Sequence, residues 1–324
     1  MRLLPIACPA GFVLVSLCVY LIGRSEPPVE PGPPLAPAVR TLGQRYGGKY
    51  KSLESRTKVK RDGKEVILVK YRWADPHHSG IVKWEGDTAY LDPKAEERLL
   101  DVTLRIDPER LEAAKESFGV GKAWLEAGPG AADPAGWIAQ AARRGIVVKF
   151  EEGRKIVSVD HPWVVRHSTA DAKPAAEALT HLWKVKAYST KRELLAVMAS
   201  FCQWMEYKTP SSERTNAAGE TVITTGVTMP LETLDKGEGD CDTKSLLFAS
   251  ILANVPDQHL VFLTGQGHLF VGVRAVPRKG DHFVEIQGAR YLLIEMTSPW
   301  PIGRVPGKQM TGWEEKSFRV TRIL

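Results

Sequence analysis

The sequence predicts an α+β protein in which a cysteine-bearing helix packs on a mostly antiparallel sheet. A small α/β module and an amino-terminal transmembrane helix precede this part of the chain. Apolar residues follow Cys241 at positions 246, 247, 248, 251 and 252, which is the spacing of one buried helical face. Four strand-like runs come after that helix, and strands that follow one another in this way favour an α+β arrangement. These runs are 259–263, 268–273, 283–286 and 291–296.

The bulk properties are those of an ordinary folded protein. The 324 residues are enough for roughly two domains, and 43% of them are hydrophobic and 25% charged, which are typical fractions. The net charge of +6 is mild and the basic group at 58–61 is short, so the sequence does not predict nucleic-acid binding. Of four cysteines, Cys8 and Cys18 lie near the amino terminus, which excludes a disulfide scaffold.

The amino terminus carries a predicted membrane anchor. Residues 3–23 form an uncharged run of 21 residues, long enough to cross a bilayer as a helix. Arg2 gives a positive start, which favours a cytoplasmic amino terminus. A cleaved signal peptide is the alternative, but no small-x-small cleavage site follows the apolar core. We expect a signal anchor over 1–24, a proline-rich linker over 25–44, and a single-pass protein whose catalytic domain is extracytoplasmic, either periplasmic or extracellular.

Residues 45–174 read as an α/β module whose role the sequence does not define. The pair His77 and His78 suggests a metal, but no further ligand stands at a sensible spacing, so a solvated loop is the better interpretation. Asp107 and Asp133 each precede a proline, which is the pattern of a helix start. We expect a strand at 65–71, helices after these two aspartates, the second over 137–144 and stopped by Gly145, and a hairpin of 147–150 with 155–159.

A second domain is predicted over 175–324, after a break at about 168–174. Its first helices are expected over 175–183 and 191–207. Thr190 and Glu193 form a capping-box pattern at the start of the second of these helices.

The helix that starts at Cys241 carries a candidate nucleophile. Asp240 is a natural N-cap, and the positive end of the helix dipole favours ionisation of a thiol in the first turn. Such a thiol needs a base. His268 is the best candidate, because it follows Gly267 and opens an apolar strand. The alternative is a histidine that is satisfied at a strand edge.

Glu295 is the candidate third residue. It is the only charge in the run 291–297, and a buried carboxylate needs a partner such as a histidinium. The alternative is an edge position that faces water. Cys202 is the rival thiol, but it lies among apolar residues of a helix, where cysteine packs as a small hydrophobe. A disulfide between Cys202 and Cys241 stays open at this point.

The order of cysteine, histidine and acid resembles the transglutaminase-like superfamily, in particular bacterial transglutaminase-like cysteine peptidases. The similarity covers roughly residues 185–306, and its motifs read Gly239-Asp240-Cys241-Asp242-Thr243-Lys244 and Glu295-Met296-Thr297-Ser298-Pro299-Trp300-Pro301-Ile302-Gly303. The resemblance implies a papain/transglutaminase-like domain. In it Cys241 is the nucleophile, His268 the general base and acid, and Glu295, where many members have Asp, orients the histidine. By the same resemblance Gln203 donates a side-chain N–H to the oxyanion.

The sequence therefore predicts a membrane-anchored thiol enzyme that cleaves or transfers amide bonds of a protein or peptide substrate through an acyl-enzyme. The alternative is a catalytically idle anchored scaffold or binding protein of the same fold. No cofactor, metal or nucleic acid is expected. Calcium, which some animal relatives need, has no recognisable binding loop in this sequence.

Overall fold

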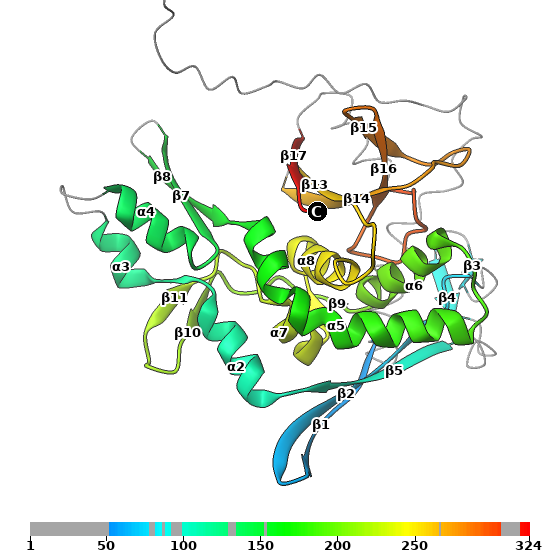
Figure 1. The fold of residues 1–324 in the computed structure, drawn as a ribbon, viewed down its shortest axis with the longest axis horizontal. Helices are drawn as coiled ribbons and strands as arrows, with labels where there is room; N and C mark the ends of the chain where they lie inside the picture. Colours follow the sequence, from blue (N-terminus) through cyan, green and yellow to red (C-terminus); the bar gives the residue numbers. More distant parts are fainter. Residues whose placement is uncertain are drawn as a thin grey trace, which may run out of the picture.

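The protein has a mixed α+β fold built around the cysteine helix, as the sequence predicts. In the computed structural model, α8 (Cys241–Leu252) lies at the centre of the molecule, with a curled sheet on one side and α5 (His161–Val185) and α6 (Lys191–Gln203) on the other (Figure 1). The structure describes residues 52–77, 82–85, 88–91, 99–128, 134–151, 154–265, 267–305 and 318–324.

Several predictions fall outside these residues. They are the anchor over 1–24, the linker over 25–44, the cap residue Asp133 and His78. Among the helices that the structure does describe, none combines the length and the apolar composition that a bilayer crossing requires.

The first part of the chain forms an antiparallel sheet in the order β1 (Leu53–Arg61), β2 (Lys64–Ala74) and β5 (Leu99–Ile106). Alternate residues of β2 are buried, as expected of a strand with one face on a core. The strand predicted at 65–71 is confirmed. The remaining elements are β3 (Val82–Glu85), β4 (Thr88–Leu91), α2 (Pro108–Ser117), β6 (Val120–Gly121), α3 (Lys122–Ala127), α4 (Pro134–Ala142), β7 (Ile146–Glu151) and β8 (Arg154–Val159).

Local signals in this part are confirmed. Asp107 caps α2 by accepting the backbone N–H groups of Glu109 and Arg110, and β7 pairs with β8 as the predicted hairpin. The second predicted helix is α4, and Gly145 follows it with φ of +73°, a backbone conformation that glycine adopts without strain.

The predicted break at 168–174 is wrong, because these residues fall inside α5. The predicted domain boundary after residue 174 also lies within this helix. This helix is continuous for 25 residues, with Pro174 in its interior. A proline there removes one helical hydrogen bond. Burial of Ala172, Ala175 and Leu179 on the same helix holds α5 together across that position, since tertiary packing supplies most helical stability.

The last part of the chain supplies the sheet that flanks α8. Its strands run in the order β15-β16-β14-β13-β17, and every neighbouring pair is antiparallel. Thr190 and Glu193 form the predicted capping box of α6, although α6 ends at Gln203 and not at 207. The elements are β9 (Glu206–Tyr207), β10 (Glu213–Thr215), β11 (Thr221–Ile223), α7 (Pro230–Lys236), β12 (Glu238–Gly239), β13 (Leu260–Gly265), β14 (His268–Arg274), β15 (Phe283–Ile286), β16 (Ala289–Ile294) and β17 (Arg319–Arg322).

One hydrophobic core joins the two parts of the chain. Tyr71 and Trp73 of β2 pack edge-on against Phe201 of α6, with ring centroids 4.9 and 5.3 Å apart. The Trp73 indole N–H also donates to Ser200 Oγ at 3.0 Å. The β1-β2-β5 sheet therefore packs directly on the helix that supports α8.

Candidate active site

The chain before α8 is shaped to present Cys241 at the start of a helix. Asp240 caps the helix by accepting the backbone N–H of Thr243 at 3.0 Å. A side chain at Gly239 would place its Cβ 2.8 Å from Thr243 Cγ2, so glycine is required there. Cys241 is the first residue of the helix and is 9% exposed.

His268 pairs with the buried Glu295. His268 opens β14, and its Nε2 lies 2.9 Å from Glu295 Oε2. Glu295 follows the last residue of β16, which lies between β15 and β14 in the sheet, and its side chain is fully buried. The alternative in which Glu295 faces water from an edge strand is therefore wrong.

Thr297 completes the surroundings of this carboxylate. Its backbone N–H and its hydroxyl donate to Glu295 Oε1 at 2.7 and 2.6 Å. Burial acts to raise the pKa of Glu295, but His268 and the two donors from Thr297 outweigh burial and lower this pKa. The pair therefore presents an ionised carboxylate to the imidazole.

Cys241 lies against the first residues of β14. The backbone N–H of Leu269, the residue after His268, acts on the Cys241 sulfur and favours its thiolate. His268 in turn acts electrostatically on Asp242, the residue after the cysteine. The structure thus brings the start of α8, the start of β14 and the end of β16 together at one place.

The ionisation of Cys241 differs from the sequence prediction. The helix start predicts a lowered thiol pKa, whereas burial, followed by the charges of Asp242 and Asp240, raises the pKa of Cys241 to about 12. The thiol also donates to Asp242 Oδ1 at 3.4 Å. In this resting arrangement two neighbouring carboxylates and burial outweigh the helix dipole.

His161 is a neighbour of the site that sequence reasoning missed. It is the first residue of α5, and its Nε2 lies 3.7 Å from Asp242 Oδ2. Burial opposes ionisation of Asp242, yet His161, Cys241 and His268 together lower the pKa of its carboxyl. Eighty residues separate His161 from Cys241, and no local pattern in the sequence links them.

Gln203 has a different role from the predicted one. Its side-chain Nε2 donates to the backbone carbonyl of Glu295 at 2.7 Å and to that of Trp300 at 2.9 Å. A side-chain amide has two hydrogens, so this geometry leaves neither for an oxyanion. Gln203 therefore fixes the chain around Glu295.

Lys244 is fully buried one turn after Cys241. Its ammonium donates to the backbone carbonyls of Gln203 at 3.3 Å and Met205 at 2.6 Å, and it therefore ties α8 to the end of α6. Burial lowers the pKa of Lys244 to about 8. The sequence places Lys244 in the cysteine motif but does not predict this supporting role.

Cys202 is a packing residue, as predicted. It is fully buried in α6, and burial raises the pKa of its thiol. Cys202 and Cys241 are both free thiols, so the disulfide that the sequence left open is not formed.

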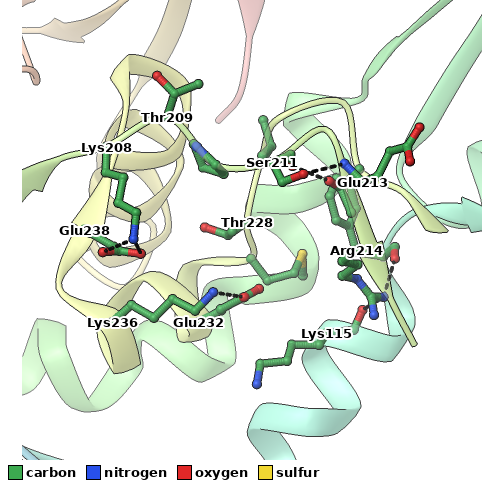
Figure 2. Close-up of a pocket in the computed structure, with 15 residues that line it drawn as sticks. Lys115, Lys208, Thr209, Ser211, Glu213, Arg214, Thr228, Glu232, Lys236 and Glu238 are labelled. Carbon is green, nitrogen blue, oxygen red and sulfur yellow. Dashed lines mark hydrogen bonds and ion pairs between the residues drawn. The ribbon is translucent and has the colours of Figure 1, made fainter. Parts of the chain in front are cut away.

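One cavity lies away from the candidate trio, among the chain segments before β12 and the ends of α2 and α7. It has a volume of about 190 Å³, and none of the three candidate residues lines it. Figure 2 shows Lys208 paired with Glu238, and Lys236 paired with Glu232, at distances of 2.9 and 2.7 Å. Because its cations are already paired with carboxylates, this cavity does not indicate a charged ligand.

His77, the described member of the histidine pair, contacts the start of α6 and the residues just before it. Its Nε2 lies 3.2 Å from the backbone carbonyl of Glu193, and its ring packs edge-on against Tyr188. Within the described part of the chain, no group of three histidine, cysteine, aspartate or glutamate residues is placed to hold a metal ion.

Comparisons with protein-family models, with curated proteins and with solved structures gave no match to this chain.

Proposed function

We propose that this protein is a transglutaminase-like thiol enzyme that cleaves or transfers amide bonds of a protein or peptide. The observation that carries the proposal is the pair of His268 and the buried Glu295, with Nε2 and Oε2 2.9 Å apart, beside the amino-terminal residue of the cysteine helix. A nucleophile, a base and a group that orients the base are the parts that acyl transfer through a thiol requires.

Each residue has a definite task in this reaction. Glu295 engages Nε2 of His268, which leaves Nδ1 as the ring nitrogen that takes the thiol proton. The Cys241 thiolate attacks the carbonyl carbon, and the imidazolium then protonates the departing amine. The resulting thioester is released by water in a peptidase or by an amine in a transglutaminase.

The backbone N–H of Cys241 is the best donor for the oxyanion. The first N–H groups of a helix have no partner inside the helix, and the capping carboxylate of Asp240 is engaged by Thr243. Because Gln203 is committed to Glu295 and Trp300, stabilisation of the oxyanion falls to the backbone.

The test is active-site labelling with an electrophilic peptide probe that captures an acyl-enzyme. We expect Cys241→Ala to abolish labelling and turnover, and His268→Ala to reduce both by at least about a hundredfold. Cys202→Ala is the matched control, since it removes the other described thiol and should leave labelling unchanged. Equal labelling of the Cys241→Ala variant and the unaltered protein would refute the proposal.

A catalytically idle scaffold of the same fold is the second candidate, and the raised pKa of Cys241 favours it. An idle thiol should be alkylated no faster than a free cysteine thiol, whose pKa is about 8.5. Peptide turnover that depends on His268 would exclude this candidate.

We also propose that the amino-terminal run of 21 uncharged residues anchors the protein, with the enzyme part on the extracytoplasmic side. Protease added to spheroplasts, whose cytoplasmic membrane is still closed, should cleave the enzyme part. Protection that persists until the cytoplasm itself is released would contradict this orientation.

A further inference from the structure

The thiol of Cys241 contacts a carboxylate other than Glu295, and a second imidazole lies beside that carboxylate. Sγ donates to Asp242 Oδ1 at 3.4 Å, and Asp242 Oδ2 lies 3.7 Å from His161 Nε2. His161 is the first residue of α5, and Cys241 and Asp242 are the first two of α8. The amino-terminal ends of two helices therefore meet at Asp242, next to the sulfur.

This arrangement works against the reaction that the trio would perform. A carboxylate that accepts a hydrogen bond from the thiol stabilises the neutral thiol and opposes formation of the thiolate. A group that weakens the negative charge of Asp242 would release the thiol, and His161 is the imidazole placed to do so.

His161 has an unused capacity to donate. Its ring is 8% exposed and packs edge-on against Phe262 of β13 at 5.7 Å. Its Nε2 is buried and has no hydrogen-bond partner among the described residues. A buried nitrogen without a partner is costly, and a small approach to Asp242 would provide one.

We propose, on the basis of the function proposed above, that Asp242 and His161 are positioning residues that control where the Cys241 proton goes. In the resting protein the proton stays on Sγ, because Asp242 accepts the Sγ–H···Oδ1 hydrogen bond. When His161 donates to Asp242 Oδ2, that hold weakens, the S–H bond breaks, and the proton passes to His268. Thiolate and imidazolium form together, so charge is conserved and no oxidant is needed.

The charged groups around the sulfur agree with this division of roles. Asp242 and Asp240 act on the Cys241 thiol. His161 of α5 and His268 of β14 act on Asp242, while Phe262 of β13, which packs against the His161 ring, is apolar. The two aspartates raise the thiol pKa, and His161 is the leading group that lowers the pKa of Asp242.

The test measures how fast iodoacetamide alkylates Cys241 in the full-length chain between pH 6 and 10, with the Cys241 peptide quantified by mass spectrometry. Asp242→Asn removes a charge next to the sulfur and should lower the thiol pKa by at least about one unit. The thiolate fraction then rises about tenfold and the rate about threefold, because a less basic thiolate is a weaker nucleophile. Glu65→Gln, an exposed site with the same change of charge, should have no effect.

The role of His161 is tested in the same assay. His161→Phe keeps a ring against Phe262 but cannot donate, and it should slow alkylation severalfold. In the Asp242→Asn background the same change should have no further effect, because His161 acts through Asp242. An unchanged or slower rate in Asp242→Asn, or an equal His161→Phe effect in both backgrounds, would overturn the proposal. If Asp242→Asn does not fold, Asp242→Ser replaces it with the same expectation.

This assay separates the present proposal from the proposed function. Alkylation requires only the thiol, so the Asp242 and His161 effects would be measured even in a protein that turns over no substrate. Conversely, turnover that depends on His268, together with alkylation that is insensitive to Asp242, would support the proposed enzyme function and refute the proposed role of Asp242 and His161.

Discussion

The side-chain amide of Gln203 donates to the backbone carbonyl of Glu295 at 2.7 Å, so a residue of α6 holds the acidic member of the candidate trio in place. The backbone carbonyl of Gln203 in turn accepts from Lys244, one turn after Cys241. The cysteine helix and the segment that carries Glu295 are thus both anchored to the end of α6.

Replacement of Gln203 by alanine should leave two buried carbonyls, those of Glu295 and Trp300, without donors. We expect the free energy of unfolding to fall by about 2–4 kcal/mol, as measured by urea denaturation. Gln140→Ala is the matched control, because Gln140 is exposed on α4 and its replacement should cost less than about 0.5 kcal/mol. Equal effects of the two substitutions would contradict the supporting role of Gln203.

Glu295 should make the fold sensitive to acid. Its pKa is lower in the folded protein than the usual glutamate value of 4.5, so the unfolded chain binds more protons as the pH falls below about that value. The contribution of Glu295 to stability is therefore present above pH 4.5 and lost as the pH falls through its lowered pKa. Urea denaturation of Glu295→Gln between pH 7 and 3 should show a weaker loss on acidification than the unaltered protein, and an identical loss would be evidence against the buried ion pair.

Lys244 should produce a dependence of the same sign at alkaline pH. Its pKa is lowered from 10.5 to about 8, so the unfolded chain binds more protons between these values and the free energy of unfolding rises with pH. Between these pH values the free energy of unfolding should rise by about 3 kcal/mol. Lys244→Met should remove this rise between pH 8 and 10.5, measured by urea denaturation. The exposed Lys58→Met is the control and should retain it.

The continuity of α5 predicts that residues 175–324 do not fold alone. Val164 and Val165, in the first half of the helix, are fully buried in the common core, and a fragment without them exposes the surface that they cover. Circular dichroism and thermal unfolding should show a cooperative transition for residues 52–324 and none for 175–324. A cooperative transition in the shorter fragment would support the domain boundary that the sequence predicts after residue 174.

Much of the site could be predicted because its signals are local. Asp240 precedes an apolar helix, and the structure confirms it as the N-cap. Glu295 stands in an otherwise apolar run, and the cost of a buried carboxylate predicts a partner, which is His268. In both cases a few neighbouring residues contain the physical reason.

Other features depend on parts of the chain that only the fold brings together. Nothing in the residues around Asp242 indicates a partner for its carboxylate. The structure places it near His161, which belongs to a helix that starts about eighty residues earlier. The thiol pKa was predicted from the helix start alone, but burial and two carboxylates decide it. Pro174 is a helix breaker by propensity, whereas the buried alanines and leucine of α5 overrule it.

His161, which lies beside the candidate site, is the first residue of α5. This helix is about 37 Å long and continues through the predicted boundary at residue 174. A recombination that exchanged everything before this boundary would bring in a foreign residue where His161 now stands. Any chimera that is meant to keep the chemistry of Cys241 must therefore place its junction ahead of residue 160.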